Sequence, residues 1–234
     1  MLKASSTIRK YVDDFISLLL PTTCHHCHQT LRKNEHHICT LCQIDLPTTN
    51  YHLSYNDNPL FNDLKIIENV TFAAAYLHYQ KFGLAQTLLH QLKYCGNYEL
   101  GVQLGLWYGS HLENKVLGDI LIPVPIHPKK LKTRGYNQSQ AIAEGLQQRL
   151  RIPLGVDHVS RVRNTSTQTR KKKIGRWMEL QGAFKVKQPE RIQSRRIVVV
   201  DDVVTTGSTI YALCEQLNLF KPKSIQVLAI ATGK

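Results

Sequence analysis

The stretch IVVVDDVVTTGST, residues 197–209, decides the fold. Its first four residues are β-branched and apolar, which is typical of a strand buried on both faces of a parallel sheet. A small hydroxyl-rich turn follows, and from Ser208 onward the apolar side chains have helical spacing, with Ser208 or a neighbouring threonine expected as the N-cap. A strand, a turn and a helix in this order direct the first helical amides toward one point, which favours an anion. The stretch therefore predicts a phosphate site at the carboxyl end of a strand.

Two carboxylates stand at the edge of this predicted phosphate site. Asp201 and Asp202 repel phosphate, so we expect them to contact another part of the ligand, because carboxylates bind sugar hydroxyls or Mg²⁺. Gly207 lets the backbone approach a ligand closely. The turn contains no lysine and no Walker A pattern. The predicted ligand thus carries a phosphate next to a diol. The hydroxyl donors of the turn are Thr205, Thr206, Ser208 and Thr209.

The second half of the chain alternates strand and helix patterns, which predicts an α/β fold with a parallel sheet flanked by helices. An apolar strand is expected at 120–124, a basic loop at 127–139 and a last strand at 223–232. Residues 70–79 read as a strand or a hairpin arm, and residues 47–69 as a connecting segment. Helical spacing of apolar side chains occurs at 7–20, 82–96, 97–112 and 139–150.

Two CxxC pairs near the N-terminus predict a metal centre. Cys24 and Cys27 form the first pair, Cys39 and Cys42 form the second, and 11 residues separate them. Four thiolates from two tight turns complete a closed tetrahedral site, so we expect structural zinc. The alternative is two disulfides or redox pairs, which a reducing cytoplasm disfavours.

The composition fits one α/β domain of ordinary size with a small additional unit. The chain has 234 residues, of which 42% are hydrophobic. We expect a helix and the Cys₄ zinc unit at residues 1–46, and the α/β domain at 47–234. No apolar run reaches the roughly 18 residues that a membrane span needs. Asp13 and Asp14 interrupt the apolar N-terminal segment, so it does not resemble a secretory signal and a cytoplasmic protein is expected.

The positive charge of the chain is concentrated in its middle. The formal net charge is +13, and residues 129–196 hold 18 Lys and Arg against 4 Asp and Glu. Such a segment favours a polyanionic partner, such as single-stranded DNA. The alternative is a solvated basic face with no partner.

Position by position, residues 197–209 resemble the 13-residue signature of type I phosphoribosyltransferases, which bind 5-phosphoribosyl-1-pyrophosphate (PRPP) with Mg²⁺. The resemblance implies that the turn at 205–209 holds the 5′-phosphate. It implies that Asp201 and Asp202 contact the ribose hydroxyls and act in catalysis, with Val203 beside them in the PRPP site.

The pyrophosphate of PRPP requires cations on the other side of the ribose. The basic loop offers Lys129, Lys130 and Arg134, together with Lys132. Arg134 is the first choice, also for a catalytic role, because a guanidinium binds phosphate in a bidentate manner. The resemblance also implies a lid that closes over PRPP and excludes water. Its candidate residues are Arg163, Thr165, Gln168 and Arg176.

The whole layout resembles the ComF family, whose members pair an N-terminal Cys₄ zinc unit with a phosphoribosyltransferase domain. The segments that carry this resemblance are LLLPTTCHHC, IPVPIHPKKLKTRGYNQSQAIA and RNTSTQTRKKKIGRWMELQGAF. Glu179 departs from the family, which often has Asn there. The resemblance implies PRPP binding, transfer of phosphoribosyl to an unknown acceptor, and a link to DNA uptake with a helicase-like partner. The alternative is a PRPP-responsive adaptor that binds single-stranded DNA without catalysis.

Overall fold

The computed structural model describes residues 21–54, 57–112, 115–163 and 182–233. The chain divides into two compact units, Met1–Leu46 and Pro47–Lys234. The helix expected at residues 7–20 lies outside the described residues. Among the described helices, none has the length and apolar content that a membrane crossing requires.

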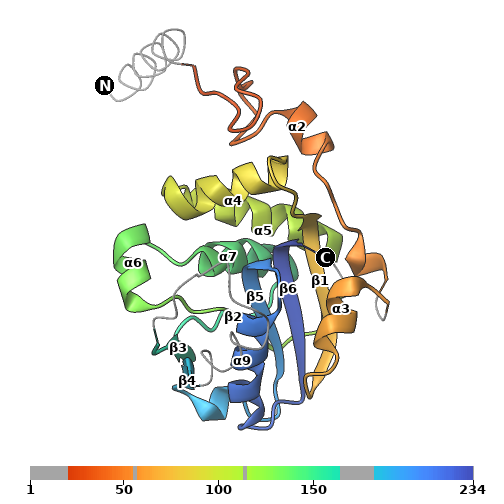
Figure 1. The fold of residues 1–234 in the computed structure, drawn as a ribbon, viewed down its shortest axis with the longest axis vertical. Coiled ribbons are helices and arrows are strands. Elements are labelled where there is room, and N and C mark those ends of the chain that lie inside the picture. Colours follow the sequence, from red (N-terminus) through yellow and green to blue (C-terminus); the bar gives the residue numbers. More distant parts are fainter. Residues whose placement is uncertain (1–20, 55–56, 113–114, 164–181, 234) are drawn as a thin grey trace, which may run out of the picture. The chain divides into compact units, whose positions relative to one another are not determined.

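A four-stranded parallel sheet forms the centre of the second unit (Figure 1). Its strand order is β1 (Val70–His78), β6 (Ser224–Thr232), β5 (Arg196–Val204) and β2 (Ile120–Pro123). Neighbouring strands pair in parallel throughout, so residues 70–79 are a strand and not a hairpin arm. The apolar run of β5 is fully buried from Ile197 to Val200, as the sequence predicts for a central strand. The parallel sheet confirms the α/β fold class that the sequence predicts.

Helices and a small second sheet surround the central strands. The helix α7 (Gln138–Leu150) packs on β5 and β2, α3 (Pro59–Leu64) packs on β1, and α9 (Ser208–Asn218) packs beside β4 (Phe184–Val186). The antiparallel strands β3 and β4 form the second sheet, which the sequence analysis did not predict. The remaining elements are α2 (Thr40–Ile44), η1 (Tyr51–Leu53), α4 (Leu84–Tyr94), α5 (Tyr98–Leu112), α6 (Pro128–Arg134), β3 (Val159–Arg161) and η2 (Pro189–Arg191).

Two glycines allow α5 and α7 to pack backbone against backbone. A Cβ atom on Gly105 would lie 2.1 Å from the carbonyl oxygen of Ile142, and one on Gly145 would lie 2.1 Å from that of Val102. Real Cβ atoms do not approach a carbonyl oxygen so closely, so both positions require glycine. This contact fixes the distance between α5 and α7, and α7 in turn packs on the strand that carries Asp201.

The prediction of a basic loop at 127–139 was wrong, because α6 lies within it. The side chain of His127 caps this helix, with its Nδ1 accepting a hydrogen bond from the Lys129 amide at 3.2 Å. Pro128 occupies the first helical position, and Gly135 ends the helix with a φ of 80°. A proline at the start and a glycine at the end are standard helix boundaries. The sequence analysis weighed the high charge of the segment and overlooked these two helix boundaries.

Two further predictions were wrong in detail. Residues 47–69 are more than a connecting segment, since α3 forms there with the Asn58 side chain accepting a hydrogen bond from the Phe61 amide at 2.9 Å. The N-cap of α9 is Gly207, at a φ of 75°, and not Ser208, while the hydroxyl of the neighbouring Thr206 accepts a hydrogen bond from the Ser208 amide at 3.5 Å. Glycine adopts this left-handed conformation without the steric penalty of a side chain. The turn before α9 therefore combines a glycine in the left-handed conformation with a hydrogen bond from the Ser208 amide to the Thr206 hydroxyl.

Candidate functional site

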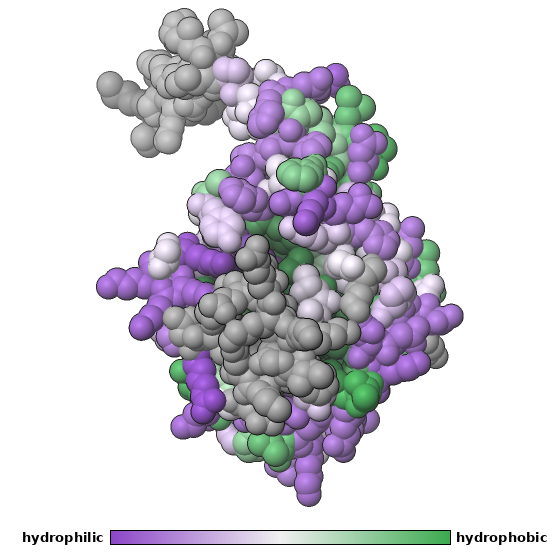
Figure 2. Space-filling view, in the orientation of Figure 1, coloured by the Kyte–Doolittle hydropathy of each residue, from purple (hydrophilic) through white to green (hydrophobic). Residues whose placement is uncertain are grey.

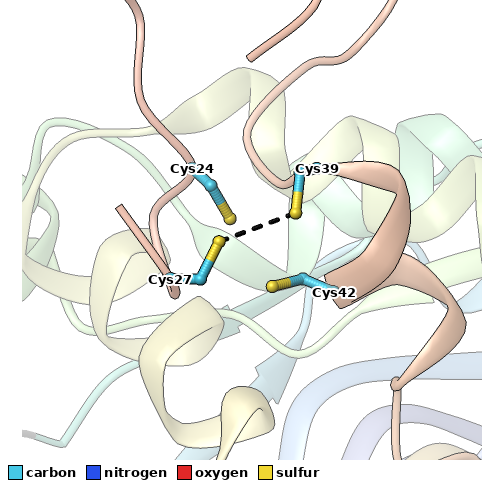
Figure 3. Close-up of side chains that lie close together, drawn as sticks. All are labelled: Cys24, Cys27, Cys39 and Cys42. Carbon is cyan, nitrogen blue, oxygen red and sulfur yellow. Dashed lines mark hydrogen bonds between the residues drawn. The ribbon is translucent and has the colours of Figure 1, made fainter. Parts of the chain in front are cut away.

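The four cysteines of the N-terminal unit converge on one point (Figure 3). Their Sγ atoms all lie within 4.8 Å of one another, and the Sγ atoms of Cys27 and Cys39 are 3.6 Å apart. A tetrahedral ion with S–metal bonds of about 2.3 Å requires sulfur atoms about 3.8 Å apart. All four cysteines, Cys24, Cys27, Cys39 and Cys42, are free thiols. The expected ligands thus come together with the spacing that one metal ion needs.

Glu35 stabilises the segment between the two cysteine pairs through hydrogen bonds. Its carboxylate accepts hydrogen bonds from the amides of Arg32 and Thr40 at 2.8 and 2.7 Å, and from the Thr40 hydroxyl at 2.6 Å. These hydrogen bonds, first that of the Arg32 amide, lower the pKa of Glu35 to about 2. Because Thr40 directly follows Cys39, Glu35 helps to hold the second pair in position.

The acidic pair lies at the carboxyl end of β5, the edge at which α/β sheets bind ligands. Asp201 is buried, and its Oδ1 accepts hydrogen bonds from the Ser139 hydroxyl at 3.0 Å and from the Asp202 amide at 2.9 Å. Burial raises the pKa of Asp201 to about 7, and the negative charge of Asp202 contributes to the rise. Asp201 therefore carries a negative charge less readily than a solvent-exposed aspartate does.

Lys93, at the end of α4, forms an ion pair with this acidic site. Its Nζ lies 2.8 Å from Oδ2 of Asp202, with side-chain exposures of 22% for the lysine and 14% for the aspartate. Burial opposes the charged form of Lys93, but the charge of Asp202, the hydrogen bond to it and the charge of Asp201 together outweigh burial and raise the pKa of the lysine. The sequence analysis did not predict Lys93 as a site residue.

A pocket of about 650 Å³ opens beside Lys93 and is lined by cations. The guanidinium carbon of Arg134 lies 5.7 Å from the centre of the Tyr94 ring, and Nη1 of Arg134 donates a hydrogen bond to Gln138 at 2.9 Å. Burial, together with the positive charges of Arg161 and Arg134, lowers the pKa of Lys130. Such crowding of like charges favours an anionic ligand. The described lining residues are Lys93, Tyr94, Gly96, Lys129, Lys130, Thr133 and Arg134, and none of them is acidic.

The helix α6 presents these cations to solvent. None of its residues is buried, and Lys129 and Lys132 are exposed. Figure 2 shows hydrophilic side chains gathered where Figure 1 places α6, at the left edge of the second unit. Of the predicted pyrophosphate ligands, Lys129, Lys130 and Arg134 all line the pocket, whereas Lys132 does not belong to its described lining.

The predicted phosphate turn directly follows the acidic pair. The hydroxyl oxygens of Thr206 and Ser208 lie 2.9 Å apart, and Thr205 is exposed. Val203 and Thr209 are half-buried. The first amides of α9 begin at Ser208, and the first turn of a helix has no intrahelical acceptors for its amides. The turn thus offers both hydroxyl and amide donors.

The predicted lid is described only at its start. Arg163 is exposed, and Thr165, Gln168 and Arg176 lie outside the described residues. The sequence analysis missed Lys93, Ser139 and Arg161, which join the site from α4, α7 and β3. Their positions follow from tertiary packing, and no local motif marks them.

The chain is similar to a known domain family and to several known proteins. Residues 137–234 match the phosphoribosyl transferase domain family. The DNA utilization protein YhgH of Shigella flexneri is 27% identical over 232 residues, covering 90% of this chain and 96% of that protein. Competence protein F of Haemophilus influenzae is 34% identical over 49% of this chain and 51% of its own. Competence protein ComFC of Bacillus subtilis is 26% identical over 80% of this chain and 74% of its own.

The parallel sheet, the acidic pair at the end of β5 and the family match define a protein with a phosphoribosyltransferase domain of type I. The chain as a whole is similar to the competence proteins of the ComF type and to the DNA utilization proteins.

Proposed function

We propose that this protein binds PRPP with Mg²⁺ and transfers its phosphoribosyl group to an acceptor, in a process linked to DNA uptake. One observation carries the proposal: the acidic pair precedes the turn between β5 and α9 along the chain, and it forms an ion pair with a lysine of a pocket lined by four cations. The turn follows Asp202 along the chain, and Lys93 joins Asp202 to the pocket. PRPP has the matching order of groups, a phosphate, a ribose diol and a pyrophosphate.

Each subsite has a role in this proposal. The amides and hydroxyls at 205–209 bind the 5′-phosphate, since a helix N-terminus favours an anion. Asp201 and Asp202 accept hydrogen bonds from the ribose hydroxyls. Lys129, Lys130 and Arg134 bind the pyrophosphate.

Mg²⁺ suits the acidic end of this site, because it binds carboxylates together with substrate phosphates. Asp201 and Asp202 are the residues that would hold it, directly or through the ribose hydroxyls. When bound, Mg²⁺ supplies positive charge for the pyrophosphate.

The reaction is a displacement at C1 of the ribose. The bond between C1 and the pyrophosphate oxygen breaks, and its electron pair leaves with pyrophosphate. A lone pair on the acceptor forms the new bond to C1. The cations of the pocket stabilise the charge that develops on the leaving group, in an arrangement that exists before the reaction. No covalent intermediate with the protein is required.

We further propose that the cysteine cluster holds a structural zinc ion. Four thiolates with closed tetrahedral spacing leave no open position for catalysis. The ion then stabilises the fold of a unit that has few apolar residues to bury.

A second candidate function is a non-catalytic adaptor that binds single-stranded DNA and responds to PRPP, together with a helicase-like partner. The names of the competence homologues and the exposed cations of α6 favour it. Binding to phosphates by exposed lysines weakens steeply with salt.

Calorimetry with PRPP and Mg²⁺ tests the proposed site. We expect wild type to bind, and the double variant Asp201→Asn/Asp202→Asn to lose at least about 100-fold in affinity, since each lost charge-assisted hydrogen bond removes roughly 1.5–3 kcal/mol. The matched control is Asp119→Asn, which removes a carboxylate at the opposite, amino end of β5, where Asp119 pairs with Arg196 at 2.6 Å. Equal affinity in wild type and the double variant would remove the assignment.

Release of pyrophosphate from PRPP then separates the two functions. Incubation with nucleobases, amines and oligonucleotides identifies an acceptor if the protein is a transferase. PRPP binding without release by any acceptor, together with salt-sensitive oligonucleotide binding, favours the adaptor.

A further inference from the structure

Lys93 is shared by two regions of opposite charge. Its ammonium lies 2.8 Å from the Asp202 carboxylate, and the same side chain lines the pocket that contains Lys129, Lys130 and Arg134. Among the described cations that line the pocket, Lys93 is the one that forms an ion pair with the acidic pair. It comes from α4, before the segment at 137–234 that matches the phosphoribosyl transferase domain family.

The charges around Lys93 favour different positions with and without a ligand. Without an anion, the three neighbouring cations of the pocket repel the ammonium and Asp202 attracts it. A ribose hydroxyl or a metal ion that approaches Asp202 competes for the oxygen that now contacts Lys93. A pyrophosphate in the pocket places several negative charges on the other side of the same ammonium, and partial burial of the pair weakens solvent screening.

We propose that Lys93 is an exchangeable counter-ion: it neutralises Asp202 in the ligand-free protein and transfers its contact to the pyrophosphate when PRPP binds. This inference rests on the proposed function. The exchange couples ligand binding at the acidic pair to ligand binding in the cationic pocket. When pyrophosphate attracts Lys93, the Asp202 carboxylate becomes available to the ribose diol or to the metal ion. The acidic end is thus kept neutral until the anionic end is filled.

The proposal predicts effects of opposite sign on cation and anion binding. Removal of the Lys93 charge leaves Asp202 without its counter-ion, so a divalent cation alone binds more tightly. The same change removes one cation from the pyrophosphate pocket, so PRPP binds more weakly. A purely structural lysine, or a simple anion ligand, would not strengthen metal binding.

The experiment measures Mn²⁺ binding by electron paramagnetic resonance and PRPP–Mg²⁺ binding by calorimetry on the full chain. For Lys93→Met we expect Mn²⁺ to bind about tenfold more tightly and PRPP about tenfold more weakly, each factor corresponding to about 1.4 kcal/mol. Loss of the gained Mn²⁺ affinity in the double variant Lys93→Met/Asp202→Asn assigns that signal to the acidic pair. Lys93→Arg keeps the charge and should leave Mn²⁺ binding close to wild type.

Two matched lysine variants separate the exchange from simpler effects. Lys129→Met removes a cation from the pocket without touching Asp202, so PRPP should bind more weakly while Mn²⁺ binding stays unchanged. Lys223→Met removes an exposed cation next to the amino end of β6, at the opposite end of the sheet, and reports the effect of net charge alone. It should change neither affinity by more than about twofold.

The possible failures can be told apart. Unchanged or weaker Mn²⁺ binding in a folded Lys93→Met variant overturns the counter-ion exchange, and so does the absence of Mn²⁺ binding from all variants. Wild-type PRPP affinity in Lys93→Met also overturns it while leaving the proposed function intact. If wild type itself does not bind PRPP, the proposed function fails, and the exchange with pyrophosphate fails with it. The Mn²⁺ data then still show whether Lys93 neutralises Asp202.

Discussion

The cysteine cluster and the acidic site are built in opposite ways. All four cysteines come from residues 24–42, where two short turns bring their sulfur atoms together. At the acidic site, by contrast, Lys93, Ser139 and Asp202 come from α4, α7 and β5. The first site is formed by a short local segment, whereas the second depends on the packing of a whole domain. A change that damages one should therefore leave the other unaffected.

Metal removal has the largest expected effect in this comparison. A chelator should unfold residues 21–46, because a structural zinc site supplies about 10 kcal/mol or more of binding free energy and a unit this small has little core. In amide NMR spectra of the full chain, signals of the N-terminal unit should lose their dispersion while those of β1, β5 and β6 remain.

A pair of cysteine variants controls this result. Cys39→Ser removes a ligand and should reproduce the effect of the chelator. Cys95→Ser, at an exposed cysteine outside the cluster, should keep the metal. Loss of dispersion across the sheet strands on chelation would contradict the independence of the two units.

The converse change is Gly105→Ala in the α5–α7 contact. The new Cβ would lie 2.1 Å from the Ile142 carbonyl oxygen, so the helices must separate. We expect a loss of roughly 3 kcal/mol in the free energy of unfolding of the α/β domain, at the upper end for an overpacked core. Urea denaturation followed by circular dichroism measures it, with the metal content of the cysteine cluster unchanged.

Whether Gly105→Ala lowers or raises the free energy of unfolding tests the contact between α5 and α7. Helix propensity alone predicts that alanine stabilises an interior helical position by about 1 kcal/mol relative to glycine. A more stable Gly105→Ala protein would therefore show that α5 and α7 do not pack as described. Gly233→Ala serves as the control, since no atom lies within 4 Å of its added Cβ atom.

The same distinction between local and distant contacts explains what the sequence could predict. The cysteine ligands, the strand of β5 and the turn before α9 were found because each is marked by a short pattern in consecutive residues. The parallel direction of the strands followed from the alternation of strands and helices in the sequence. The boundary residues of α6, Pro128 and Gly135, were equally visible but were overlooked among its lysines.

The partners of the acidic pair could not be predicted in this way. Lys93 reaches Asp202 only because α4 ends beside the carboxyl edge of β5, and 109 positions separate the two in sequence. Ser139 lies in the first turn of α7, where its sequence context indicates a helix start and nothing about Asp201. An ion pair between distant elements depends on tertiary packing, which no single motif encodes.

A smaller expected effect concerns the Asp201 carboxylate, which lowers the stability of the ligand-free protein at high pH. The pKa of Asp201 is about 7 in the folded protein, against about 3.9 in an unfolded chain. The folded state therefore binds more protons than the unfolded state between these two values, and the carboxylate increasingly destabilises the ligand-free fold as the pH rises through this window. Asp201→Asn should be more stable than wild type at pH 8, by roughly 2 kcal/mol, and closer to wild type at pH 5.

Urea denaturation of ligand-free protein at pH 5 and pH 8 checks this prediction. Asp119→Asn is the contrasting variant, because hydrogen bonds from Arg196 lower the pKa of Asp119. Its substitution should reduce stability at pH 8. Equal stability of Asp201→Asn and wild type at both pH values would mean that burial does not disfavour the charged carboxylate.

The smallest expected effect concerns the brace around the cysteine cluster. Glu35→Gln keeps the size of the side chain and one acceptor oxygen, but removes the charge that holds the amides of Arg32 and Thr40 at 2.8 and 2.7 Å. Competition with a chromophoric chelator should show zinc affinity lowered by about tenfold, the lower end of the range for residues that support metal ligands. Glu99→Gln, an exposed glutamate in the first turn of α5, controls for net charge. If both variants bind zinc equally tightly, the cysteine turns hold their geometry without Glu35, and the local site is even less dependent on its surroundings than the comparison implies.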